Sequence, residues 1–152
     1  MKQTLPLYAG RAERFFAYLI DTLILLLPGS LVVALLKGED AAVVGVFLVS
    51  LGYYTYFTAS RWQATPGKRL LSIYVVRTDN RALTPRDALE RFLGFILPSL
   101  PIYSSIMPQQ QAAMLVFWLT LFWFAPILFT PERIGLHDRL CRTRVVVGKV
   151  GA

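Results

Sequence analysis

The chain has 152 residues, of which 55% are hydrophobic and 13% aromatic, and its formal net charge is +7. A chain this apolar and this short fits a single membrane domain, which we expect to cover residues 1–152. Its one cysteine, Cys141, excludes an intramolecular disulfide and a cysteine-rich metal site, and nothing in the composition calls for a cofactor.

The first long apolar run covers residues 15–36 and contains one ionisable residue, Asp21. Its length suffices for a spanning helix, which needs roughly 20 residues. The run is longer than a signal-peptide core and no small-residue cleavage site follows it, so we expect it to be retained and the mature chain to begin at Met1.

Asp21 is the first candidate functional residue. An Asp inside a membrane costs about 2.5–3.5 kcal/mol on insertion scales, so it faces a partner or water rather than lipid. Two interpretations stay open, namely an ion- or proton-coupling group and a structural acid that holds helices together. Arg14 lies on the same helical face two turns earlier, about 10 Å away along the axis. We expect Arg14 to reach the headgroups or to bridge Asp21 to a third group.

The second apolar run, residues 41–58, follows a short polar turn, so the two runs form a hairpin. Tyr54 lies seven residues inside Arg61, as Asp21 lies seven inside Arg14, which places Tyr54 and Asp21 at one depth. We predict a hydrogen bond from the Tyr54 hydroxyl to Asp21, direct or through one water. The alternative is that Tyr54 is an interface anchor in the headgroups.

The middle loop, residues 59–85, is polar and contains a β-branched and aromatic stretch at 70–76 that predicts a short strand. Gly67 and Lys68 resemble the end of a phosphate-binding loop. That motif needs a glycine where Trp62 stands and Ser or Thr where Arg69 stands, so we reject it.

A third run, residues 86–107, begins with Thr84 as N-cap and Pro85 at the first helical position. Pro98 and Pro101 interrupt it, so we expect a kinked, re-entrant or short crossing. The fourth run, residues 112–129, is a full crossing.

The tail, residues 130–152, ends in a strand-like stretch at 143–147, which we pair with 70–76 because each would otherwise expose an edge. The predicted fold is therefore an all-α integral membrane protein, a four-helix transmembrane bundle with a small cytoplasmic β element.

Of the sixteen Lys and Arg residues, only Lys37 lies outside the N-terminal segment, the middle loop with the start of the third helix, and the tail. The positive-inside rule then places both termini in the cytoplasm of an integral plasma (inner) membrane protein. Contact with anionic headgroups accounts for the basicity without nucleic acid.

Three motifs stand in order along the chain: residues 14–21 (RFFAYLID), residues 64–71 (ATPGKRLL), and residues 136–140 (LHDRL) with Thr143. In these, the chain resembles the RDD family of membrane proteins over nearly its whole length. The family is named for an arginine and two aspartates, which the resemblance maps onto Arg14, Asp21 and Asp138. The resemblance implies a multi-pass membrane protein whose suspected activity is transport, including cation/proton exchange.

Two functional hypotheses remain open. In the first, the protein is a proton- or cation-coupled transporter in which Asp21 binds the ion, helped by Arg14 and a cytoplasmic Asp138 gate. Four short helices enclose little volume, so this hypothesis favours a homo-oligomer. In the second, the protein is an accessory or assembly factor whose buried charges only specify helix packing.

Catalysis is the weakest reading. His137 is the only histidine and adjoins Asp138, with no Gly-x-Ser-x-Gly serine and no second His for a metal pair, so we predict that the protein is not an enzyme. His137 itself is either a hydrogen-bonding loop residue or, with an ordinary pKa of about 6.5, a cytoplasmic pH sensor.

Overall fold

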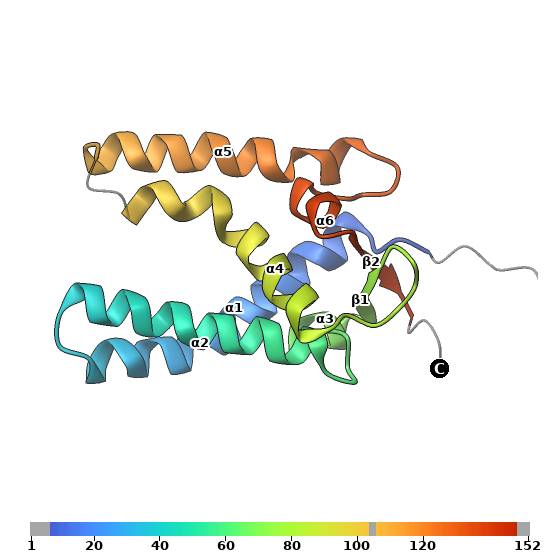
Figure 1. Cartoon of the computed structure of the whole chain (residues 1–152), viewed down its shortest axis with the longest axis horizontal. Helices are drawn as coiled ribbons and strands as arrows, with labels where there is room; N and C mark the ends of the chain where they lie inside the picture. The colour runs from blue at the N-terminus through green and yellow to red at the C-terminus, as the bar shows by residue number, and fades with distance from the viewer. Residues whose placement is uncertain (1–6, 104–105, 149–152) are drawn as a thin grey trace, which may run out of the picture.

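The computed structural model describes residues 7–103 and 106–148 of the chain and is mostly helical (Figure 1). The elements, in chain order, are α1 (Arg11–Leu35), α2 (Glu39–Ala59), α3 (Pro66–Leu70), β1 (Ile73–Arg77), α4 (Pro85–Ile96), the 3-10 helix η1 (Leu97–Tyr103), α5 (Gln109–Phe129), α6 (Leu136–Leu140) and β2 (Thr143–Val147).

The described residues contain three helices that are long and apolar enough to cross a membrane, namely α1, α2 and α5. Their large apolar side chains point outward, since Leu27 is 78% exposed, Tyr56 70% and Phe129 83%. Surfaces of this kind are stable against lipid tails rather than water. The first, second and fourth predicted runs are therefore confirmed as candidate spans.

The third predicted run is different. Its first part is α4, and its second part is η1, which contains Pro98 and Pro101. A proline removes a backbone donor and clashes with the preceding turn, so the α-helix ends at Ile96 and the chain continues as the tighter 3-10 form. This segment is not among the three long apolar helices, so the predicted count of four transmembrane helices is not confirmed.

The predicted pairing of the loop strand with the tail strand is confirmed. Strands β1 and β2 are antiparallel, with Ile73 opposite Val147 and Arg77 opposite Thr143. The predicted start of the first strand was wrong by three residues, because Leu70 ends the short helix α3, which Pro66 opens at its first position. Buried valines from both strands form much of the small core.

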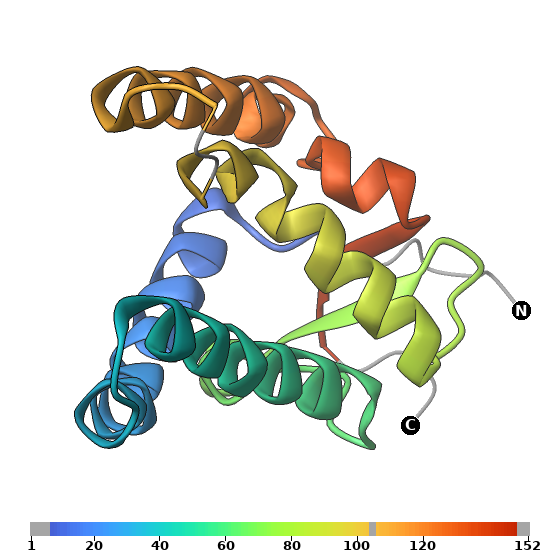
Figure 2. The same ribbon diagram turned by 60° about the vertical axis from the view of Figure 1, so that its left-hand side comes forward.

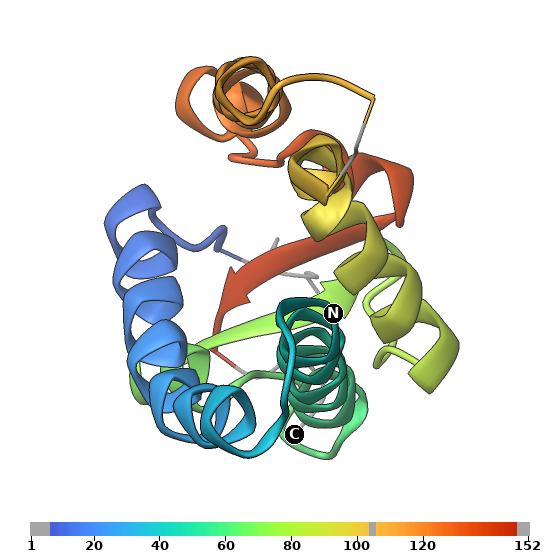
Figure 3. The ribbon, with the colours of Figure 1, turned by 90° about the vertical axis from the view of Figure 1, so that its left-hand side faces the viewer.

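One end of the molecule gathers the sheet and the short helices α3 and α6, and we call it the sheet end (Figure 1). The helices extend from it side by side. Helix α1 packs against α2 and α3, α4 packs against α2, and α5 packs against η1 and α6. Segments α4 and η1 thus lie between α2 and α5, as Figure 2 shows. Viewed along the long axis in Figure 3, α1 and α5 are the two ends of an open arc of helices.

The start of α4 carries a complete capping box. The Thr84 hydroxyl accepts a hydrogen bond from the Asp87 backbone N–H at 3.2 Å, and the Asp87 carboxylate accepts one from the Thr84 backbone N–H at 2.9 Å. This satisfies two backbone donors of the helix start and confirms the predicted N-cap.

Thr84→Ala should therefore lower the free energy of unfolding by about 1 kcal/mol, because one N-cap acceptor is lost. Thermal unfolding of the detergent-purified protein measures the effect. Thr78→Ala is the matched control, since the Thr78 side chain is exposed in the turn after β1. Equal melting temperatures for the two variants would contradict the capping role.

Candidate functional site

Asp21 is 1% exposed, and its carboxylate is satisfied entirely by neutral donors. The Tyr53 hydroxyl donates to Oδ1 at 2.7 Å, and the Gly67 backbone N–H donates to the same oxygen at 2.8 Å. The Thr65 hydroxyl donates to Oδ2 at 2.5 Å. The acid in α1 is thereby joined to α2 and to the start of α3, and it makes no ion pair within the described residues.

Gly67 is required by this arrangement. A Cβ atom at Gly67 would lie 2.3 Å from the Ala17 carbonyl oxygen and 2.8 Å from Asp21 Oδ1. Both Ala17 and Gly67 are buried, so α3 sits directly on the surface of α1. A small residue on each side lets the two backbones approach and brings the Gly67 N–H to the carboxylate.

A direct hydrogen bond from Tyr54 to Asp21, one form of the prediction, was wrong, because the direct donor is the neighbouring Tyr53. Tyr54 instead stacks on Phe92 of α4, with ring centroids 5.8 Å apart, and also lies beside Phe95. Counting residues along α2 placed the donor within one residue of the correct position. Successive residues of a helix, however, point about 100° apart around its axis. The sequence pattern did not fix that rotation. The Tyr54 ring packs against α4, and its alternative role as an interface anchor stays a prediction.

The second aspartate, Asp138, is fully buried at the start of α6. Arg14 donates to Oδ2 at 3.0 Å, Arg91 donates to Oδ1, and the Gly135 backbone N–H donates to Oδ2 at 3.2 Å. Burial alone would raise the pKa of Asp138, but the positive charges of Arg91 and Arg14 outweigh burial and hold the pKa well below its usual value. Asp138 is therefore an anion that connects α1, α4 and α6.

Arg91 is a residue that the sequence reasoning missed. It is 8% exposed and donates both to Asp138 and to the Thr143 hydroxyl at the start of β2. Positive-inside reasoning assigns Arg91 only to the cytoplasmic side of the membrane. A signal was present, since Ala88, Arg91, Phe92 and Phe95 recur at the helical period and place Arg91 on the buried face of α4.

His137 is 4% exposed, with Nε2 3.3 Å from Asp138 Oδ1 and its ring against Phe124 and Phe95. Burial lowers the pKa of His137 to about 4, and the positive charges of Arg91 and Lys68 act in the same direction against Asp138. The imidazole is therefore neutral near pH 7. The interpretation of His137 as a sensor around neutral pH does not fit this environment.

A cavity of about 470 Å³ lies between the helices. Asp21 lines it, whereas Asp138 lies behind the lining residues Arg14, Arg91 and His137. Its walls are mainly apolar and aromatic side chains of α1, α4 and α5. Its ionisable lining residues are Arg11, Arg14, Asp21, Lys68, Arg91 and His137. Burial and the charge of Arg91 lower the pKa of Lys68 to about 8, so its ammonium is still largely protonated at pH 7. Within the described residues, no group of His, Cys, Asp and Glu could hold a metal ion.

Three apolar helices of spanning length, with two buried and fully bonded carboxylates at one end, define an integral membrane protein. The chain belongs to the RDD family, whose model matches residues 8–142. It is 25% identical over 164 residues to the uncharacterized protein YxaI of Bacillus subtilis (strain 168), an alignment that covers 91% of this chain and 96% of the relative. No solved structure matches the chain. The resemblance that rested on Arg14, Asp21 and Asp138 is confirmed at the level of the family.

Tyr53→Phe should lower the free energy of unfolding by about 1–2 kcal/mol, because a buried carboxylate loses one of its donors. Tyr54→Phe is the matched control and should be close to neutral, since its hydroxyl makes no hydrogen bond with Asp21. Thermal unfolding in detergent compares them. A larger loss for Tyr54→Phe would contradict the assigned donor.

Stability should also depend on the titration of His137. Its folded pKa of about 4 lies below the ordinary value of 6.5, so between these values the unfolded chain binds a proton that the folded chain does not. The contribution of His137 to the free energy of unfolding should be at its maximum above pH 6.5. It should fall by up to about 3 kcal/mol as the pH drops toward 4. His137→Gln should flatten this part of the pH profile, and an unchanged slope in the variant would assign it to other groups.

Proposed function

We propose that this chain is a multi-pass transport protein of the inner membrane, and that the central cavity is its substrate compartment. The observation that carries the proposal is the cavity itself, about 470 Å³ with apolar walls and charged groups at one end. Its volume falls within the range of about 300–1,000 Å³ typical of ligand sites, and such sites combine apolar walls with a few polar groups.

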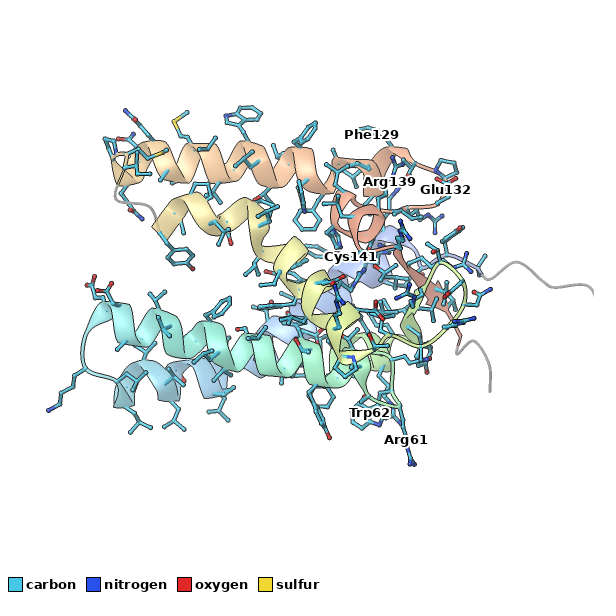
Figure 4. The ribbon with its side chains drawn as sticks, in the orientation of Figure 1. Arg61, Trp62, Phe129, Glu132, Arg139 and Cys141 are labelled. Atoms are coloured by element: carbon cyan, nitrogen blue, oxygen red, sulfur yellow. The ribbon has the colours of Figure 1, made fainter. Side chains whose placement is uncertain are left out.

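The proposed orientation has the sheet end in the cytoplasm. Fifteen of the sixteen Lys and Arg residues belong to segments that we assign to this side, and Lys37 stands in the turn between α1 and α2 at the opposite end. Arg61 and Arg139 both lie at the sheet end in Figure 4. In this arrangement α4 and η1 together form a broken crossing, the third of four in chain order. Four crossings bring both termini to the cytoplasm.

We assign Asp21 and Asp138 a structural role in transport in place of the ion-coupling role that the first hypothesis gave to Asp21. A coupling acid must release and regain a proton or cation during the cycle. Asp21 is instead held by three hydrogen-bond donors, one of them a backbone N–H, and Asp138 by two guanidinium groups. These contacts fix α1, α3, α4 and α6 around the cavity and so position its charged end.

The accessory role is the alternative. Protein interiors pack at about the density of organic crystals, and a bundle that only needed to be rigid would gain stability by filling this space. The open cavity therefore favours a protein that receives a ligand. Binding without chemical conversion fits the residues present, because the imidazole next to Asp138 is neutral and enclosed by Phe95 and Phe124.

Flux through proteoliposomes tests the proposal. The wild type should accelerate at least one of two processes: proton movement driven by a sodium or potassium gradient, read by an internal pH dye, and transbilayer movement of a fluorescently labelled phospholipid. Ala125→Trp should reduce that flux to near the rate of protein-free liposomes, because Ala125 lines the cavity and an indole would fill it.

Ala113→Trp is the matched control, since Ala113 is exposed on the same helix and does not line the cavity. It should retain wild-type flux. If the wild type accelerates neither process, the accessory role is favoured over transport.

A further inference from the structure

We infer that the cavity binds an anionic phospholipid drawn from the surrounding bilayer, with the lipid phosphate at Lys68 and an acyl chain along the apolar walls. The inference rests on the proposed function and names the class of its ligand. Four observations carry it: a surplus of positive charge, unpartnered donors, apolar walls, and an opening toward the membrane.

The cavity has more cations than anions. Its lining includes four basic residues, namely Arg11, Arg14, Lys68 and Arg91. Two carboxylates are near: Asp21 is in the lining, and Asp138 lies behind it, bonded to Arg14 and Arg91. Asp138 is already shared between two arginines, and Asp21 is satisfied by neutral donors. The site therefore has net positive charge, and an anion is the ligand that it stabilises.

Two donors at this end have no partner. The Lys68 ammonium makes no hydrogen bond or ion pair within the described residues, and its half-buried side chain lines the cavity. The Nε atom of Arg14 is buried and likewise unbonded. A buried donor without an acceptor, as the Arg14 Nε–H is, costs about 1–3 kcal/mol. A phosphate group supplies several strong acceptor oxygens and a negative charge. It would therefore pair with the Lys68 ammonium and accept a hydrogen bond from the Arg14 Nε–H.

The walls suit an acyl chain rather than a free inorganic anion. Aromatic and aliphatic side chains from three helices surround the space, including Phe15, Tyr18, Phe95, Leu121, Phe124 and Leu128. A small hydrated anion would gain nothing from these surfaces. An acyl chain from the bilayer can lie along them without desolvating a polar group and gains van der Waals contacts with the side chains of the walls.

The opening lies between α1 and α5. These helices both line the cavity but stand at the two ends of the arc in Figure 3, and neither packs extensively against the other. Phe15 and Tyr18 of α1 are 62% and 49% exposed, and Leu121 and Leu128 of α5 are 48% and 54% exposed, although all four line the cavity. The cavity thus opens sideways into the region where lipid tails lie.

The polarity of the cavity matches that of a lipid in the inner leaflet. Lys68 and His137 come from the short helices of the sheet end, whereas Phe15, Leu121 and Phe124 come from the long apolar helices. With the sheet end at the cytoplasmic surface, the positive groups are at headgroup level and the apolar walls run into the bilayer. A phospholipid can therefore enter without turning over.

Native mass spectrometry of the full-length protein, released from detergent after incubation with defined probes, tests the inference. The probes are dioleoylphosphatidylglycerol, dioleoylphosphatidylcholine and inorganic phosphate. The wild type should retain phosphatidylglycerol in preference to phosphatidylcholine and should retain no inorganic phosphate. Lys68→Gln should weaken phosphatidylglycerol binding by at least about fivefold, the loss expected for one lysine near an anionic lipid.

Lys37→Gln is the matched control, because it removes the same charge in the turn at the far end of α1 and should leave binding unchanged. Lys68→Arg should restore most of the affinity. Ala125→Trp should abolish lipid retention through steric exclusion, and it decides the question if Lys68→Gln does not fold. Ala113→Trp should bind as the wild type does.

Equal retention of the two lipids, equal effects of Lys68→Gln and Lys37→Gln, or unchanged binding in Ala125→Trp would each overturn the inference. So would a stable dimer that excludes lipid from the gap between α1 and α5. If cation-driven proton flux persists while no phosphatidylglycerol is retained, the proposed transport function stands and the lipid assignment fails. Lipid retention without any flux would support the inference and overturn the transport function.

Discussion

The shared carboxylate of Asp138 is the interaction on which the arrangement of the helices depends. Two guanidinium groups from different helices, Arg14 in α1 and Arg91 in α4, meet on this one buried anion. Removing one member of a buried charge cluster costs about 3–5 kcal/mol, because the remaining charges are left uncompensated. Helix α5 packs mainly against η1 and α6, and besides the hydrogen bond from Arg11 of α1 to the Ile127 carbonyl this cluster helps to tie α1 to the part of the molecule that contains α5.

The second aspartate solves the same physical problem in another way. Asp21 has no cationic partner and is satisfied by two hydroxyl groups and one backbone N–H. This difference matters for the cavity, because the Lys68 ammonium forms no direct ion pair within the described residues although Asp21 lines the same space. One acid therefore organises the helices by charge pairing, and the other does so by hydrogen bonding alone.

The large-scale organisation could be predicted because it follows from local patterns. Apolar run length identified α1, α2 and α5, the Thr84 to Pro85 pattern identified the start of α4, and unpaired strand edges predicted the sheet. The donors to Asp21 could not be predicted in the same way. Choosing Tyr53 over Tyr54 needs the rotation of α2 about its axis, which tertiary packing sets. The buried role of Arg91 could not be predicted from positive-inside reasoning, which considers where a residue lies along the chain and ignores which face of the helix it occupies.

The separation along the chain between each aspartate and its partners imposes an order on biosynthesis. The donors to Asp21 lie 32, 44 and 46 residues after it, so all three have been synthesised once α3 is complete. Arg14, in contrast, lies 124 residues before Asp138. Its side chain has no Asp138 partner until α6 has been translated. The first three helices thus satisfy the buried Asp21 early, whereas the salt bridge between Arg14 and Asp138 can form only after α6 has been synthesised.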